Sequence, residues 1–213
     1  MGALITEEMM QNALTWAWDS SINGVPGSGT AVELAKDYLK ENENLEDAID
    51  SLISWQVRKC GASGFITGLG GLATMPVAIP VNLGSTLYIQ MRMVAAIAYM
   101  CGKDIHSDQV QTLGYLCLCG NSGKEVVRNF GIQIGTKIAK QQIQRIPRET
   151  LKAINRAVGF KLITKFGEKG VINLGKMVPI VGGVISGGVD AAATQAIAAE
   201  AKNRFYYSDG EDI

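Results

Sequence analysis

The sequence predicts an all-α fold, a single helical bundle with glycine-rich apolar helices packed in its core. Three observations support this fold class. Apolar side chains recur every three or four residues in successive segments, which is the pattern of a helix buried along one face. Several segments begin with a hydroxyl or amide side chain followed by acids, as helices do. The chain has no convincing run of alternating apolar and polar residues, which a half-buried strand would require.

The stretch 24–30 reads GVPGSGT and separates the first two predicted helices. A phosphate-binding loop reads GxxxxGK[ST] after a buried strand, and the lysine that would reach the phosphates is missing here. A helix that starts at Thr6 precedes the loop. Thr30 and Glu33 have the spacing of a capping box, so Thr30 is expected to cap the next helix, which continues through Tyr38. The sequence therefore predicts a helix-loop-helix joint with no bound nucleotide.

The third predicted helix leads into a long uncharged segment. Asn44 and Asp47 open this helix, and no charged residue occurs over 61–91. Four glycines of that segment, at positions 61, 64, 68 and 71, would form one stripe on a helix. Such a stripe indicates the close approach of another helix, a ligand or a lipid. After two prolines, a second apolar helix is predicted over 81–100.

The remaining segments are also predicted to be helical. Three helices are expected from their starting residues, which are Ser107, Ser122 and Pro147. The second of these helices is basic and continues to Ile138. A last apolar helix over 178–200 carries Gly183 and Gly187 in G-x-x-x-G spacing, and we expect it to pack against the glycine stripe of 61–71.

Length and composition fit one domain. The chain has 213 residues, of which 47% are hydrophobic, and this is enough for a sizeable core. We expect a single helical domain over 1–205 and an acidic, disordered tail over 206–213. The four cysteines lie in apolar stretches and His106 is the single histidine, so we expect no metal and no other cofactor. Buried thiols and the lack of a secretory signal favour the cytoplasm.

Charged residues are segregated along the chain, although the formal net charge is zero. Residues 1–59 carry a net charge of −6, and residues 124–176 carry a net charge of +9. A region this basic indicates an anionic partner: phospholipid headgroups, nucleic acid, or the acidic N-terminal third of the chain itself. We favour the membrane surface and expect no nucleic acid.

Basic residues interleaved with isoleucines are the candidates for contact with an anionic membrane. They are Lys137, Lys140, Arg145, Arg148 and Lys152. The same composition is that of an ordinary amphipathic helix of a bundle, which is the alternative interpretation.

A membrane-spanning hairpin is the alternative to a membrane-surface protein. Residues 60–79 are uncharged and long enough to cross a bilayer. Five of these twenty residues are glycine, however, and the next helix carries Gln90 and Arg92 near its middle. An arginine there costs about 2.5–3.5 kcal/mol or more on insertion. We therefore expect a soluble or membrane-surface protein whose apolar hairpin is buried.

Polar side chains in otherwise apolar or basic helices are the candidate ligand-binding residues. The set is Asn82, Gln90, Arg92, Lys165, Lys169 and Asp190. Together with Ser85 and Thr86, the first three fall within a broad sector of helix 81–100, so one face of that helix is expected to be polar. A buried arginine requires a partner, and Asp190 is the first candidate partner of Arg92. The alternative to this structural pair is a polar pocket for a ligand headgroup or for catalysis.

Four phrases of the sequence resemble the EcsC family of bacterial proteins. They are NGVPGSGTAVELAKDYL at 23–39, GLGGLATMPVAIPVNL at 68–83, LYIQMRMVAAIAYMCG at 87–102 and VGFKLITKFGEKGVINLGKMVPIVGGVISGG at 158–188. The resemblance covers nearly the whole chain and implies a mainly helical bacterial protein. It supplies no active site, because the biochemical activity of the family is not established. Many members carry an acidic residue where this chain has Asn82, so the resemblance does not imply a carboxylate role here.

Three hypotheses of function follow. The leading one is a non-enzymatic, membrane-associated helical protein that docks on anionic lipid or on a membrane protein through the basic region, at the inner face of the cell membrane. The second is a soluble module that binds a lipid or other amphiphile between its two glycine-faced helices, with Arg92 as the headgroup partner. The third is an uncharacterised hydrolase that uses Lys165, Lys169 or Asp190.

Overall fold

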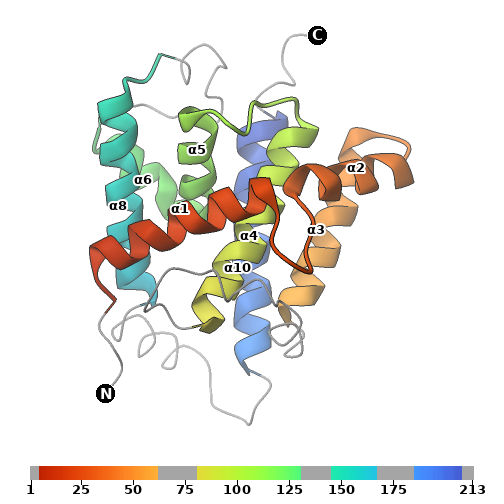
Figure 1. The fold of residues 1–213 in the computed structure, drawn as a ribbon, viewed down its shortest axis with the longest axis horizontal. Helices are drawn as coiled ribbons and strands as arrows, with labels where there is room; N and C mark the ends of the chain where they lie inside the picture. The colour runs from red at the N-terminus through yellow and green to blue at the C-terminus, as the bar shows by residue number, and fades with distance from the viewer. Residues whose placement is uncertain (1–4, 62–80, 131–144, 167–184, 208–213) are drawn as a thin grey trace.

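The computed structural model describes residues 5–61, 81–130, 145–166 and 185–207, and the regular elements in these ranges are helices (Figure 1). The α-helices are α1 (Glu7–Asn23), α2 (Ala31–Glu41), α3 (Leu45–Gly61), α4 (Val81–Met100), α5 (Asp108–Leu118), α6 (Gly123–Arg128), α8 (Arg148–Phe166) and α10 (Ile185–Ala201). A 3₁₀ turn, η3 (Gly120–Ser122), precedes α6, and a π-helical turn, η4 (Lys202–Tyr206), continues α10. The predicted all-α class is confirmed.

The bundle is built around α4. Six consecutive residues of this helix, 93–98, have no exposed surface. A helix that is apolar on every side has to be surrounded by other elements, and α4 contacts α1, α2, α3, α5 and α10. In Figure 1, α1 lies across α4 and α8, while α2 and α3 form the opposite flank. The predicted bounds of this helix, 81–100, are confirmed.

The side chains predicted to start helices make the expected hydrogen bonds. The hydroxyls of Thr6 and Ser107 accept backbone N–H groups of their first turns at 3.2 and 3.3 Å. The Thr30 hydroxyl accepts the N–H of Glu33 at 3.0 Å, and the Glu33 carboxylate accepts the N–H of Thr30 at 2.7 Å, which completes the capping box. The amide oxygen of Asn44 caps α3 in the same way. Each such cap stabilises a helix by about 1 kcal/mol.

The basic helix predicted from Ser122 is shorter than expected within the described residues. It begins at Gly123 and ends at Arg128, and residues 129–130 form a turn. Ser122 does not cap it, because its hydroxyl donates to the carbonyl oxygen of Cys119 at 2.8 Å. Residues 131–138, which were predicted to continue the helix, lie outside the described residues. The predicted helix at Pro147 is confirmed and starts one residue later, as α8.

Two glycines let large side chains approach neighbouring helices closely. A Cβ atom on Gly114 of α5 would clash with the indole of Trp18 from α1. A Cβ atom on Gly159 of α8 would clash with Gln11, whose amide donates to the carbonyl oxygen of Asn155 at 2.8 Å. Packing of α1 against α5 and α8 therefore depends on these small residues.

The predicted contact between two glycine-faced helices lies outside the described residues. Residues 62–80 contain three of the four glycines of the first stripe, and Gly183 of the second set precedes α10. Within the described part of the chain, α10 packs against α3 and α4.

Hydrogen bonds and ion pairs join the C-terminal end of the described chain to α3. The ammonium group of Lys202 donates to Glu46 at 2.9 Å and to Asp50 at 2.7 Å. The hydroxyls of Tyr206 and Tyr207 both donate to the Glu46 carboxylate at 3.4 Å. These two tyrosines were assigned to the tail in the sequence analysis, and residues 208–213 lie outside the described residues.

Candidate functional site

The exposed side of α8 carries a row of cations that ends in an aromatic ring. We define the α8 surface by its members, which are Arg145, Arg148, Lys152, Arg156 and Phe160; each is exposed. The last four recur every fourth residue and therefore share one side of the helix. The opposite side, with Leu151, Ile154, Val158 and Leu162, is buried against the bundle. Because charged and apolar residues alternate at helical spacing, this segment forms an amphipathic helix. Its apolar side is buried and its charged side remains exposed to water.

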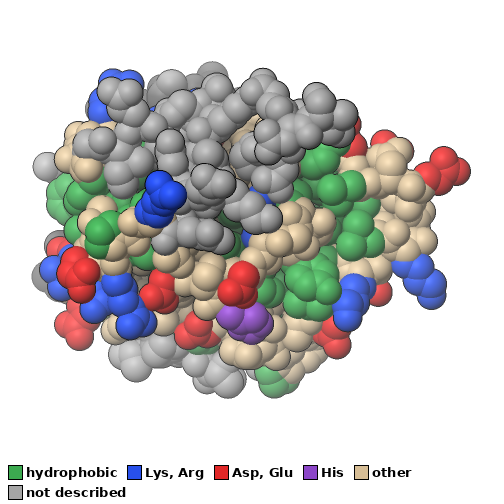
Figure 2. Space-filling view, turned by 90° about the horizontal axis from the view of Figure 1, so that it is seen from above, with side chains coloured by type: hydrophobic (Ala, Val, Ile, Leu, Met, Phe, Trp, Pro, Cys, Tyr) green, Lys and Arg blue, Asp and Glu red, His purple; other side chains and the backbone are tan. Residues whose placement is uncertain are grey.

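Acidic side chains neutralise the α8 surface only in part. Arg148 forms an ion pair with Asp108 of α5 at 2.8 Å, and both side chains are largely exposed, at 71% and 46%. Such an exposed pair contributes little to stability. Among the described residues, Lys152 and Arg156 have no ion-pair partner. Figure 2 shows acidic and basic side chains interspersed on the face that it presents.

Phe160 is the most exposed large hydrophobic residue in the described part of the chain, at 62%. Its ring lies one helical step beyond Arg156, on the same side of α8. The structure thus adds Arg156 and Phe160 to the predicted basic residues Arg145, Arg148 and Lys152. Continuing the four-residue step from Lys152 along the sequence would have found both. The predicted residues Lys137 and Lys140 lie outside the described residues.

The polar residues of α4 face two different sides of that helix, so the expectation of a single polar face is wrong. Gln90 points to α10, where its amide donates to the Thr194 hydroxyl at 3.1 Å in a buried site. Arg92 points to the loop between α1 and α2, where Nη2 donates to the carbonyl oxygen of Thr30 at 3.4 Å. Two residues along a helix correspond to a rotation of about 200°, which separates the two side chains.

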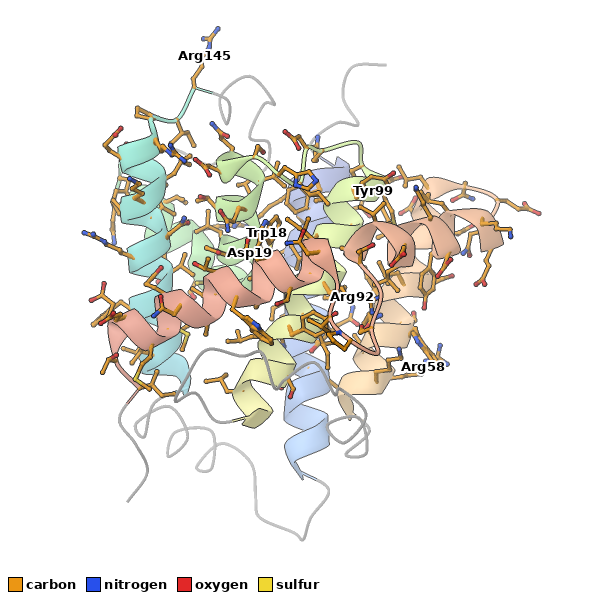
Figure 3. All side chains as sticks on the ribbon, in the orientation of Figure 1. Trp18, Asp19, Arg58, Arg92, Tyr99 and Arg145 are labelled. Carbon is orange, nitrogen blue, oxygen red and sulfur yellow. The ribbon has the colours of Figure 1, made fainter. Side chains whose placement is uncertain are left out.

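The described contact of Arg92 is therefore with a loop and not with α10. Figure 3 shows Arg92 beside that loop. Burial lowers the pKa of Arg92, and its Nε atom is buried without a hydrogen-bond partner. The side chains of Asn82 and Asp190 lie outside the description, so the predicted Arg92–Asp190 pair is untested. Gln90 and Arg92 do not converge on one headgroup site.

The GVPGSGT stretch is a helix-loop-helix joint, as predicted. Gly24 and Gly27 adopt positive φ angles of 80° and 82°, which glycine tolerates. The Tyr88 hydroxyl of α4 donates to the Ser28 hydroxyl at 3.0 Å. The hydrogen bond from the backbone N–H of Thr30 lowers the pKa of Glu33, whose carboxylate occupies the start of α2. In a phosphate-binding loop the phosphate takes that position at the helix start.

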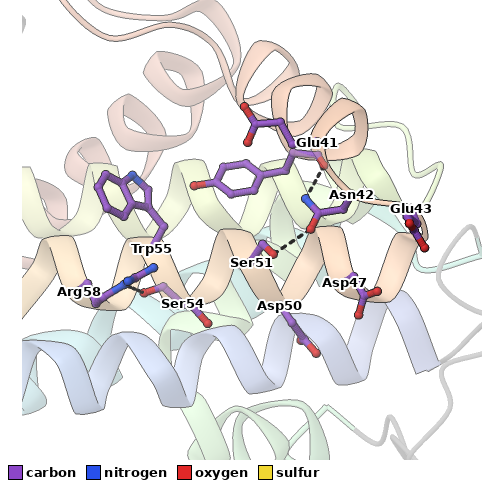
Figure 4. Close-up of a pocket in the computed structure, with 10 residues that line it drawn as sticks. Glu41, Asn42, Glu43, Asp47, Asp50, Ser51, Ser54, Trp55 and Arg58 are labelled. Carbon is purple, nitrogen blue, oxygen red and sulfur yellow. Dashed lines mark hydrogen bonds between the residues drawn. The ribbon is translucent and has the colours of Figure 1, made fainter.

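An open groove of about 610 Å³ lies between the end of α2 and α3 (Figure 4). We call it the α2–α3 groove; its lining residues are Tyr38, Glu41, Asn42, Glu43, Asp47, Asp50, Ser51, Ser54, Trp55 and Arg58. Four of them are acidic and one is basic. The Ser51 hydroxyl donates to Asn42 at 2.9 Å, which ties the α2–α3 turn to α3. The sequence analysis did not identify this groove.

The structure describes little of the surroundings of the residues proposed for hydrolysis. The side chains of Lys165 and Asp190, and the whole of Lys169, lie outside the described residues. Within the described part of the chain, no group of three or more histidine, cysteine or acidic side chains could hold a metal ion. Burial raises the pKa of the Cys117 thiol to about 12, so this thiol is protonated at neutral pH and is a poor nucleophile.

None of the helices in the described ranges combines the length and the apolar character needed to cross a bilayer. The proposed spanning segment, 60–79, falls almost entirely outside these ranges.

Comparison with known proteins agrees with the resemblance noted in the sequence. A sequence model of the EcsC protein family matches residues 5–207, nearly the whole chain. No curated protein and no solved structure matches the chain.

Proposed function

We propose, from the premise that this chain belongs to the EcsC protein family, that it is a membrane-associated helical protein that docks on anionic lipid. Docking would use the basic region of the chain through the α8 surface, at the inner face of the cell membrane. The observation that carries this proposal is the exposure of Lys152 and Arg156. Neither has an ion-pair partner among the described residues, and both share the exposed side of α8 with Phe160, which follows Arg156 by one helical turn.

The energies support a reversible contact. A cation close to an anionic leaflet contributes about 1 kcal/mol, and this contribution decreases within about 10 Å at ordinary ionic strength. A phenyl ring adds up to about 1.5–3 kcal/mol when it is fully removed from water. Lys152, Arg156 and Phe160 together therefore support weak, salt-sensitive binding. The exposed ring favours lipid, because a purely ionic partner would leave it in water.

Vesicle co-sedimentation tests the proposal. The full chain is mixed with neutral phosphatidylcholine vesicles and with vesicles that contain phosphatidylglycerol. We expect binding to the anionic vesicles only, and loss of that binding at high salt. The variant Lys152→Gln/Arg156→Gln should bind about thirtyfold more weakly, since it loses about 2 kcal/mol of attraction.

The matched control is Lys36→Gln/Lys40→Gln, which removes two exposed cations from α2 on the opposite flank. It should bind the anionic vesicles as the parent chain does. Equal sedimentation with neutral and anionic vesicles would contradict the proposal. Binding to native membranes but not to anionic vesicles would instead indicate a membrane protein as the partner.

A further inference from the structure

The acidic α2–α3 groove and the basic α8 surface lie on opposite flanks of one molecule. The helix α8 packs against α1, α5 and α6, whereas α2 and α3 form the other side of the bundle (Figure 1). The α8 surface therefore cannot reach the α2–α3 groove within one copy. Attraction between the acids of the α2–α3 groove and the cations of the α8 surface can therefore be satisfied only between molecules.

The groove is an exposed helix face as well as an acidic one, although one of its acids, Asp50, already pairs with Lys202 at 2.7 Å. Along α3, the residues Asp47, Asp50, Ser54 and Arg58 are exposed and recur at spacings of three or four, and the exposed Trp55 follows Ser54 directly. Trp55 leaves 44% of its surface in contact with water. The guanidinium of Arg58 and the ammonium of Lys59 lie 5.4 and 5.3 Å from the centre of its ring, which favours this outward position.

The two surfaces match in spacing and in chemistry. On α3, Asp47 precedes Trp55 by eight residues; on α8, Lys152 precedes Phe160 by eight residues. At 1.5 Å per residue, each charge lies about 12 Å along its helix from its aromatic ring. A parallel alignment of the two helices therefore places Lys152 against Asp47 and Phe160 against Trp55. Arg156 then lies near the middle of the groove.

We propose that the α8 surface of one copy docks in parallel orientation along the α2–α3 groove of a second copy. The contact joins two different surfaces, so a pair of copies retains one free groove and one free α8 surface. Copies would therefore associate head to tail, in a closed ring or an open series. The lipid-binding side chains of Proposed function would be covered in such an assembly, so lipid and self-association would compete for α8.

A charge exchange tests the contact without lipid. One variant, Glu41→Lys/Glu43→Lys, reverses the charge of the groove at two exposed acids that form no hydrogen bond or ion pair among the described residues. The other, Lys152→Glu/Arg156→Glu, reverses the charge of the two α8 cations that face the groove in the proposed contact and leaves the α8 surface without net charge. Sedimentation velocity at low salt should show concentration-dependent assembly of the parent chain and loss of assembly in each variant alone. An equal mixture of the two variants should assemble again, because each then meets an opposite charge.

Assembly of the parent chain should also be lost at about 1 M salt, where the Debye length is about 3 Å. Circular dichroism checks that each double variant is folded. A double variant that does not fold is replaced by the corresponding single variant, Glu43→Lys or Arg156→Glu. A monomeric parent chain, an assembling single variant or a monomeric mixture would each overturn the inference. If the parent chain stays monomeric but binds anionic vesicles, self-association is contradicted and the proposed function is still supported.

Discussion

The amide of Gln90 donates to the hydroxyl of Thr194 at 3.1 Å, at a site where neither side chain has more than 2% of its surface exposed. This bond joins α4, the centre of the bundle, to α10, more than a hundred residues later in the chain. Both flanking surfaces are apolar, so each polar group depends on the other to offset its loss of water.

We predict that Thr194→Val lowers the free energy of unfolding by about 1–3 kcal/mol, because the Gln90 amide then remains buried without its acceptor. Gln90→Leu should have a similar effect on the Thr194 hydroxyl. The double variant should be more stable than the sum of the two changes implies, since both polar groups are then absent. Urea unfolding, monitored by circular dichroism, gives the free energy of unfolding of the parent chain and of the three variants. Strictly additive effects of the two changes would contradict the prediction.

Local features of the fold were predictable from sequence because they depend on neighbouring residues. The capping box at Thr30 and Glu33 lies within four residues, and the bounds of α4 follow from Pro80 directly before it and from Gly102, with its positive φ angle, just after it. The early end of α6 at Arg128 was not predictable in this way. There, apolar spacing continues in the sequence beyond the turn at residues 129–130.

Sequence reasoning could identify exposed basic residues only where one helix contains them. Arg148 and Lys152 are exposed because the opposite side of α8 is buried, whereas Arg145 is exposed in the turn before α8, and their contact with a membrane stays a prediction. The separation of Gln90 from Arg92 follows from the rotation of about 200° between them, but their partners, Thr194 and Thr30, depend on how α10 and α2 pack around α4, which periodicity does not report. The α2–α3 groove combines residues from two helices and a turn, so no single stretch indicates it.

The contact of Lys202 with α3 predicts a loss of stability in acid. The hydrogen bond from Lys202 lowers the pKa of Glu46, so this contact stabilises the fold above the usual carboxyl range. Its contribution should disappear as pH falls through the lowered pKa and Glu46 becomes protonated. Lys202→Met should therefore show a weaker dependence of unfolding free energy on pH in this acidic window. Equal slopes for the two proteins between neutral and strongly acidic pH would contradict the assignment.

A methyl group at Gly29 should disturb the start of α2. A Cβ atom there would lie 2.6 Å from Oε2 of Glu33, the oxygen that accepts the N–H of Thr30. Gly29→Ala should displace this carboxylate and lower the free energy of unfolding by about 1 kcal/mol, the usual value of a lost cap. In a Glu33→Ala background the same change should have little effect, because the displaced group is already absent. Thermal unfolding of the four proteins checks this.

Substitution of Phe160 tests the apolar contribution to membrane binding separately from the electrostatic contribution. Its ring is 62% exposed, so Phe160→Ser should change the free energy of unfolding by less than about 0.5 kcal/mol. Binding to anionic vesicles should weaken about fivefold to tenfold, which corresponds to about 1–1.4 kcal/mol of lost apolar contact. The dependence of binding on salt should stay the same, because Lys152 and Arg156 are retained. Lys152→Gln/Arg156→Gln should show the reverse pattern, with a shallower salt dependence and the ring still present. Unchanged affinity in Phe160→Ser would mean that the ring stays in water when α8 meets the lipid, and the surface would then act through charge alone.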